Sequence, residues 1–415
     1  MSAETAEIQQ AIDSDYSLEA VPKDARRGFW AVGFVMLGFT FFSASMWVGT
    51  SLGTGFDLAG YCAVVILGGA ILAVYTGFLG YIGADTGLSM DLMAQRAFGL
   101  KGSFLPSALI SLTQMGWFGV GVAMLAIPIS DQLGISPWWI IIIGGAAMTA
   151  SAYYGIRAIE WVSFVSVPLI VILGLYSMGS AIADTPGGLE SIFSKSDGLS
   201  LLTGVAMVVG SFISGGTATP NFTRFAASTK SAVVTTVVAF FVGNTLMFTF
   251  GAVAGAFTGQ NDIFYALIAQ GLLIPAIIVL GGNIWTTNNN ALYTTGLGFS
   301  NITKIRKRPL VLVAGILGTV LAMWLYDNFV TWLNVLNATL PPVGAILIAD
   351  YFRHRENYRS PVAPDRQVNV SAVVAVIAGG AVGNFLDWGI TSINAMVVAV
   401  AIYFVGEFAA KAARK

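Results

Sequence analysis

Apolar runs of about 20 residues recur along the whole chain, and this feature limits the possible folds more than any other. Each run is long enough to cross a hydrocarbon core about 30 Å thick. Lipid offers the backbone no hydrogen bonds, so a spanning segment must be a helix or a strand of a closed barrel. Barrel strands alternate apolar and polar residues over about 10 positions, and these runs do not. The sequence therefore predicts an all-α membrane protein.

Composition supports this fold class, because 56% of the 415 residues are hydrophobic and only 10% are charged. Soluble domains carry about 25% charged residues. The pattern predicts twelve transmembrane helices, which place both termini on one side. Their predicted spans are 28–53, 58–83, 102–131, 136–156, 158–182, 199–218, 231–258, 264–298, 308–326, 328–350, 369–386 and 389–410.

The basic residues predict which side the termini occupy. Of the 20 Lys and Arg residues, all except Lys195 fall in the tails or in loops on the side of the termini. Positive charge marks the cytoplasmic side, so both termini are expected there. Residues 1–27 are polar and acidic, unlike a cleavable signal peptide, and are interpreted as a mobile cytoplasmic tail.

Charged and metal-binding residues are nearly missing from the predicted spans. Cys62 and His354 are the only residues of their kinds, which argues against a metalloenzyme or a Cys–His nucleophile. The net charge of −1 gives no attraction to nucleic acid. No span holds a central Asp, Glu, Lys or Arg that would carry a proton or pair with a charged solute. These observations favour a neutral solute and a cation bound by neutral oxygens, such as sodium.

Two spans contain segments that suit a broken helix. Residues 38–47 of the first read GFTFFSASMW, and residues 210–217 of the sixth read GSFISGGT. Gly is a poor helix former, and Ser and Thr bond locally to freed backbone groups. The first and sixth spans correspond in two five-helix halves, and such a matched pair points to a transporter binding site. Close packing of helices through small residues is the alternative explanation.

The third span carries the clearest candidate for a planar ligand. Gln114 and Trp117 are three residues apart and share one helix face. Trp offers a flat apolar surface, and the Gln amide offers a donor beside an acceptor. A hydrogen bond from Gln114 to a neighbouring helix is the alternative.

The eighth span reads GGNIWTTNNNALY over 281–293. The carbonyl of Asn283 and the hydroxyls of Thr286 and Thr287 are spaced to converge on one point, which suits sodium. Capping or interhelical hydrogen bonds are the alternative for the Thr pair. Asn288 places an amide near the same face, and Pro341–Pro342 predicts a kink in the tenth span.

Five motifs in order resemble the nucleobase–cation symporter-1 family: GFTFFSASMW, TQMGWFGVGVAM, GSFISGGT, NIWTTNNNALY and LPPVGAILIADY. The resemblance implies a fold like that of the sodium-coupled leucine transporter. Helices 1–5 (28–182) and 6–10 (199–350) would form inverted repeats after the tail 1–27, and 351–415 would add two helices and a C-terminal tail. It also implies sodium-driven import of cytosine by alternating access across a bacterial inner membrane.

The resemblance further implies the binding residues. The base would lie between two aromatic rings and bond to amides and hydroxyls; these residues are Trp117, Phe212, Gln114, Asn288, Ser214, Ser211 and Ser43. Sodium would be bound by three carbonyls and two hydroxyls, those of Gly38, Phe41, Asn283, Thr286 and Thr287. No other cofactor is expected, and a monomer is expected to function.

Four alternatives remain open at the level of sequence. The solute could be another neutral heterocycle, such as uracil, allantoin or a hydantoin, or coupling could use protons. The same architecture also serves amino-acid transporters, although Gln114 and Trp117 favour a planar ligand. A channel or sensor is the alternative from a different class. An enzyme is not expected.

Overall fold

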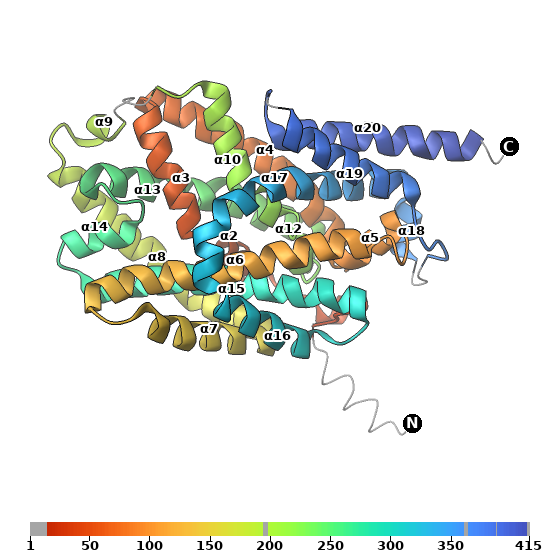
Figure 1. The fold of residues 1–415 in the computed structure, drawn as a ribbon, viewed down its shortest axis with the longest axis horizontal. Coiled ribbons are helices and arrows are strands. Elements are labelled where there is room, and N and C mark those ends of the chain that lie inside the picture. The colour runs from red at the N-terminus through yellow and green to blue at the C-terminus, as the bar shows by residue number, and fades with distance from the viewer. Residues whose placement is uncertain (1–14, 194–197, 361–363, 387, 413–415) are drawn as a thin grey trace, which may run out of the picture.

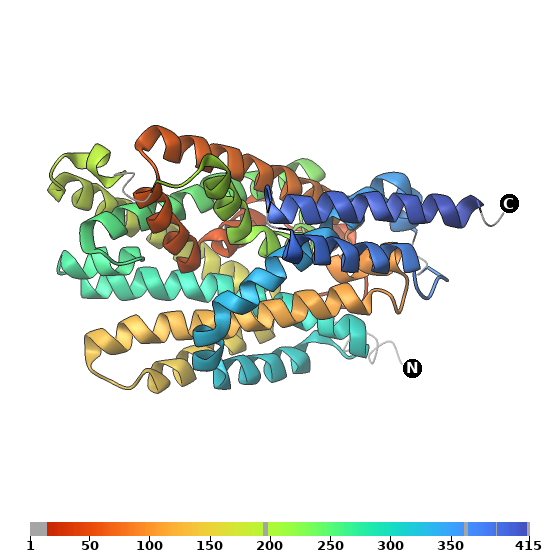
Figure 2. The ribbon, with the colours of Figure 1, turned by 45° about the horizontal axis from the view of Figure 1, so that its top comes forward.

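The computed structural model describes residues 15–193, 198–360, 364–386 and 388–412, with the backbone alone for 329–337. In this part of the chain the structure is helical, and strand-like pairing is limited to one isolated bridge between Arg27 and Ala226. Figure 1 shows the helices, and Figure 2 shows that several of the longest run along the long axis of the molecule. The predicted all-α class is confirmed.

The first half of the described chain contains long helices joined by short turns. Its elements are η1 (Lys23–Ala25), α2 (Phe29–Thr40), α3 (Ser43–Gly55), α4 (Leu58–Thr86), α5 (Met90–Phe98), α6 (Phe104–Leu133), α7 (Pro137–Tyr154), α8 (Ile156–Asp184) and α9 (Gly188–Ile192).

The second half begins with the shorter helices of the second predicted break. Its elements are α10 (Leu201–Gly216), α11 (Pro220–Thr223), α12 (Thr229–Val237), the π-helix η2 (Val238–Gly243), α13 (Asn244–Thr258), α14 (Ile263–Ala269), α15 (Leu273–Thr303), α16 (Lys307–Val320), α17 (Ala322–Arg353), α18 (Arg355–Arg359), α19 (Val370–Phe385) and α20 (Thr391–Ala412).

Every predicted span overlaps one of these helices or a helix pair. By length and composition, five of the described helices suit a membrane span, or seven if each of two bent pairs counts as one. The chain therefore contains several apolar helices able to cross a membrane, while the number twelve stays a prediction.

The first predicted break is present. Helices α2 and α3 meet at an angle of 56°. Phe41 and Phe42 between them have extended backbone conformations. At the end of α2 the Thr40 hydroxyl donates to the Leu37 carbonyl (3.1 Å), the local bonding expected of Thr at a helix end.

The second break lies at the end of the predicted segment. Helix α10 continues through residues 210–216 and ends at Gly216. Residues 217–219 form a turn, and Pro220 occupies the first turn of α11. Proline fits there because the amide hydrogen it lacks has no partner within the helix. The sixth span is thus interrupted as predicted, after the Gly–Gly pair.

Three predicted boundaries are wrong. The eighth span was expected from 264, but residues 263–269 form the separate helix α14, capped by Asp262, and α15 begins at Leu273. Gly271, with φ of 76°, makes the turn between them. The ninth span ends at Val320 rather than 326, and the tenth begins at Ala322 rather than 328, where α16 and α17 meet at 67°.

Residues 15–27 are packed against the helices, contrary to the expectation of a mobile tail for 1–27; residues 1–14 lie outside the described part. Asp15 lies 2.7 Å from Lys307, measured from Oδ2 to Nζ, and its Oδ1 accepts from the amide of Ile156 (3.0 Å). Arg224 donates to the carbonyls of Asp15 (2.6 Å) and Tyr16 (2.9 Å). This segment therefore joins the end of α11 to the starts of α8 and α16.

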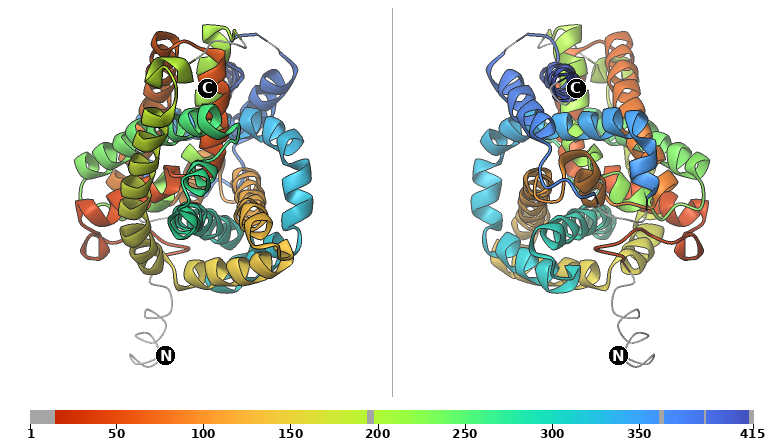
Figure 3. Two further views of the ribbon diagram at one scale, coloured as in Figure 1. Left: turned by 90° about the vertical axis from the view of Figure 1, so that its left-hand side faces the viewer. Right: turned by 90° about the vertical axis from the view of Figure 1, so that its right-hand side faces the viewer.

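The two helices with the most polar buried faces lie side by side. Helix α6 packs against α15 in the interior (Figure 3), and α3 packs against α13. Between 283 and 301 nearly all residues of α15 are buried, including Asn283, Asn288, Asn289 and Asn290. Helix α17, which contains Pro341 and Pro342, follows a strongly curved path (Figure 3).

Candidate substrate and cation site

A small cavity of about 20 Å³ lies where the first break and the last turns of α10 face α6 and α15. Five of the seven predicted substrate residues line it: Gln114, Trp117, Ser211, Phe212 and Ser214. The remaining lining residues come from α2, the first break, α10 and α15; they are Phe39, Phe42, Gly215 and Thr287. The two segments singled out from sequence, 38–47 and 210–217, and the helix face of Gln114 and Trp117 therefore meet at one cavity.

Gln114 contributes a hydrogen-bond donor without a partner. The residue is 2% exposed, and its Nε2 has no hydrogen-bond acceptor within reach. A buried polar group left unpaired costs about 1–3 kcal/mol. This favours a polar ligand in the cavity over the alternative that the amide serves a neighbouring helix.

The aromatic rings of the cavity contact each other in pairs. The ring of Trp117 meets that of Phe42 edge to face, with centroids 5.2 Å apart, and Phe212 meets Phe39 in the same way at 5.2 Å. A volume of about 20 Å³ suffices for about one water molecule. A nucleobase between Trp117 and Phe212 would therefore require the rings to move apart. Phe39 and Phe42 belong to the first-break motif but were not predicted to line the site.

Ser43 and Asn288 are not among the residues that line the cavity. The Ser43 amide and hydroxyl both donate to Oδ1 of Asn283, at 2.8 and 3.2 Å. Asn288 donates to the Phe118 carbonyl (3.0 Å), and its Oδ1 is buried without a partner. Both side chains would have to exchange partners to reach a ligand, and their roles in binding stay predictions.

The predicted cation ligands form two hydrogen-bonded groups. Thr287 Oγ1 donates to the carbonyls of Phe41 (2.9 Å) and Gly38 (3.2 Å), linking α15 to the first break. Thr286 Oγ1 lies 3.0 Å from the carbonyl of Asn283. Among the described residues no cluster of three or more His, Cys, Asp or Glu could hold a metal ion. A cation here would depend on neutral oxygens, which suit sodium at an unwound helix.

Two polar residues near the first break were missed. The hydroxyl of Ser163, on α8, is buried without a partner, and a Cβ placed on Gly38 would lie 2.8 Å from it. Asp262, which precedes α14, is 4% exposed; its carboxylate accepts from the Phe264 amide (2.9 Å) and lies close to Ser43. Burial raises the pKa of Asp262, although its contacts with Ser43 and Phe264 act to lower it. Its position in a loop gave no sign of this contact.

Comparisons with known proteins identify the family and the relatives of this chain. Residues 20–406 match the model of a family described as permeases for cytosine/purines, uracil, thiamine and allantoin. The cytosine permease of Escherichia coli (strain K12) is 48% identical over 397 residues, which cover 95% of this chain and 94% of that protein. The hydantoin permease of Microbacterium maritypicum is 25% identical over 323 residues, covering 70% and 65%.

The fold also resembles a solved structure. Mhp1, a nucleobase-cation-symport-1 family transporter, in a closed conformation with bromovinylhydantoin bound, has a TM-score of 0.79 at 20% identity. The match covers 94% of each chain.

Proposed function

Because the chain belongs to the permease family for cytosine/purines, uracil, thiamine and allantoin, the nucleobase-cation-symport-1 family, we propose that it imports cytosine with sodium by alternating access. It is a multi-pass membrane transporter for nucleobases, not an enzyme. The observation that carries the proposal is the unpaired amide nitrogen of Gln114 beside Trp117 and Phe212 in a buried cavity.

Cytosine fits the chemistry of this cavity. Stacking on an aromatic ring contributes about 1–3 kcal/mol per base but accepts any flat ring. Selectivity must come from hydrogen bonds. Cytosine presents an amino donor beside a ring-nitrogen acceptor, where uracil presents the reverse. A fixed amide at Gln114 that matches cytosine leaves polar groups unpaired against uracil, at about 1–3 kcal/mol each.

Sodium would connect the two sides of the site. The carbonyls of Gly38, Phe41 and Asn283 and the hydroxyls of Thr286 and Thr287 supply five neutral oxygens where the first break meets α15. One charge moving inward through 100 mV contributes about 2.3 kcal/mol to uptake. Binding of sodium between the break and α15 would favour the state that accepts the base.

The same proposal includes the arrangement in the membrane. Twelve helices, with 28–182 and 199–350 as inverted repeats, would lie in a bacterial inner membrane with both termini cytoplasmic. The distribution of Lys and Arg supports this orientation; Lys195, the one exception, lies outside the described residues. The monomer would be the functional unit.

Uptake into proteoliposomes tests the proposal. We expect an inward sodium gradient to concentrate labelled cytosine, and unlabelled uracil, allantoin and hydantoin to compete weakly. Concentrative uptake also excludes a channel or sensor. If uracil competes as well as cytosine, cytosine is not the preferred substrate. If uptake is unchanged when potassium replaces sodium, sodium is not the coupling ion.

Proton coupling is the second candidate, because Asp262 is a buried carboxylate in contact with Ser43 at the first break. Under this candidate a proton gradient alone drives uptake, and Asp262→Asn abolishes that uptake. Under sodium coupling, Asp262→Asn retains the response to sodium.

A further inference from the structure

Two apolar grooves run along the outside of α4, one on each side of a ridge formed by Val74 and Phe78. The first groove, of about 720 Å³, lies between α4 and α12–η2 and ends at Tyr81 and Phe352. The second, of about 600 Å³, lies between α4, α17 and α20 and includes Ile348 and Met396. Val74 and Phe78 line both grooves and are 60% and 44% exposed. Two parallel channels separated by a ridge suit the two acyl chains of one phospholipid.

The length of the first groove matches one leaflet of a bilayer. On α4 the lining extends from Ala70 to Tyr81, and at 1.5 Å per residue this stretch is about 16 Å long. Half of a hydrocarbon core is about 15 Å. The first groove is therefore long enough to extend from the middle of a membrane to one of its surfaces.

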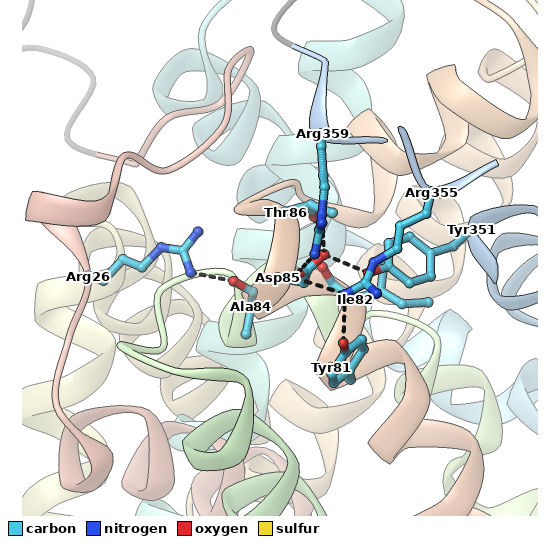
Figure 4. Close-up of polar contacts among 9 residues, drawn as sticks. All are labelled: Arg26, Tyr81, Ile82, Ala84, Asp85, Thr86, Tyr351, Arg355 and Arg359. Carbon is cyan, nitrogen blue, oxygen red and sulfur yellow. Dashed lines mark hydrogen bonds and ion pairs between the residues drawn. The ribbon is translucent and has the colours of Figure 1, made fainter. Parts of the chain in front are cut away.

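At that surface the grooves meet a cluster of arginines, shown in Figure 4. Arg355 donates from Nη2 to the hydroxyl of Tyr81 (2.8 Å), and Arg359 donates from Nη2 to Asp85 (2.8 Å). The side chains of Arg355 and Arg359 are 40% and 45% exposed. The Nε of Arg355 is buried without a partner. One guanidinium thus keeps an unused donor where the apolar groove ends.

The cluster carries excess positive charge. The Asp85 carboxylate interacts with all three guanidinium groups, those of Arg26, Arg355 and Arg359, and Glu356 interacts with that of Arg359, which leaves one positive charge. Arginine binds phosphate through paired N–H groups, and basic pockets at the membrane surface bind anionic head groups.

We propose that one anionic diacyl phospholipid binds here. Its acyl chains lie on either side of Val74 and Phe78, and its phosphate accepts hydrogen bonds from Arg355 and Arg359. The site is on the outer surface of the helices and does not depend on which solute the chain transports.

Thermal unfolding of the full chain in neutral detergent tests this site. We expect phosphatidylglycerol to raise the unfolding temperature by more than phosphatidylcholine with the same chains. Arg355→Gln/Arg359→Gln should remove this difference and leave the effect of phosphatidylcholine unchanged. Asp85→Asn, which frees both guanidinium groups, should enlarge the difference.

Further variants and lipids distinguish an anionic diacyl phospholipid from other possible occupants of the grooves. Ala73→Trp, which fills the first groove, should reduce the effect of both lipids. If the double arginine variant is too unstable, native mass spectrometry of Asp85→Asn should detect more bound phosphatidylglycerol than in the parent. If both lipids raise the unfolding temperature of the parent equally, the site does not select an anionic head group. If single-chain lysophosphatidylglycerol raises it as much as phosphatidylglycerol does, the site does not hold two acyl chains. Dimerisation that buries the grooves and excludes lipid would show that a second copy is the occupant.

Discussion

The hydroxyl of Thr287, in the middle of α15, donates a hydrogen bond to the carbonyl of Phe41, in the first break, over 2.9 Å. The break frees that carbonyl from the helical pattern, so it needs a partner from another helix. Thr287 also reaches the carbonyl of Gly38 (3.2 Å). The contact fixes the unwound segment against α15 at the oxygens that a cation would use.

Replacing Thr287 should therefore weaken the response to sodium. For Thr287→Ala we expect the sodium concentration that gives half-maximal cytosine uptake to rise roughly tenfold, equivalent to about 1.4 kcal/mol. Thr286→Ala should act in the same direction. Thr287→Ser is the matched control, since it keeps the hydroxyl and should stay close to the parent. An unchanged sodium curve for both alanine variants would show that these hydroxyls only stabilise the helices.

Gln114 should determine which base is accepted. Gln114→Leu keeps the approximate volume of the side chain and removes its donor and acceptor. We expect cytosine affinity to fall roughly tenfold, or about 1.4 kcal/mol, and the preference over uracil to shrink, as measured in a competition assay. Trp117→Ala should abolish base binding, whereas Trp139→Ala, at a residue 65% exposed, should leave it intact. If Gln114→Leu prefers cytosine over uracil as strongly as the parent does, residues other than Gln114 determine the selectivity.

The breaks could be predicted because their causes are local. Gly, Ser and Thr at 38–47 and 210–217 weaken the helix wherever they occur, and the structure interrupts both spans at or directly after these residues. Gln114 and Trp117 share a face by helix geometry alone. Their meeting with Ser211 and Phe212 in one cavity required only that the third and sixth predicted spans approach each other.

Other features depend on contacts between distant residues. Asp262 lies in a loop 219 positions after Ser43, and nothing near it in sequence shows that it folds back onto the first break. Residues 15–27 look like a polar tail because the partners of Asp15, such as Lys307 and Ile156, are remote in sequence. Helix α14 was merged with α15 because the apolar pattern continues across Gly271.

The ion pair between Asp15 and Lys307 should be important for stability. The two side chains are 3% and 1% exposed, and Nζ of Lys307 also donates to the carbonyl of Ala152 (3.2 Å). Lys307→Met leaves the Asp15 carboxylate buried without its cation, which typically costs about 3–5 kcal/mol. We expect a large fall in the unfolding temperature, partly restored in Asp15→Asn/Lys307→Met.

The exposed pair of Arg366 and Glu407 provides a control for this prediction. Arg366 is 42% exposed, and its Nη1 lies 3.2 Å from Glu407. Exposed ion pairs contribute about 0–1 kcal/mol, so Arg366→Gln should change the unfolding temperature little. Similar effects of Lys307→Met and Arg366→Gln would contradict the importance of the buried pair.

Asp91 should make the stability of the protein depend on pH. It lies in α5, in the connection between α4 and α6, and its Oδ1 accepts from the Ser107 hydroxyl (2.6 Å) while Oδ2 is buried without a partner. Burial raises the pKa of Asp91 to about 6, although the hydrogen bond from Ser107 and the positive charge of Arg224 act to lower it. Between the ordinary pKa of an aspartate, about 4, and this value the folded state binds more protons than the unfolded state. Stability due to Asp91 is therefore greatest at low pH and is lost as the pH rises towards 6.

Asp91→Asn should remove this dependence. At pH 7 the variant should be more stable than the parent by an amount on the order of 2–3 kcal/mol, because the amide needs no deprotonation in a buried site. Unfolding temperatures measured from pH 4.5 to 7.5 should decline less steeply for the variant. Asp24→Asn, at an exposed position, is the matched control and should follow the parent. A variant that is less stable than the parent at pH 7 would mean that the Asp91 carboxylate is ionised and bound by cations in the folded state.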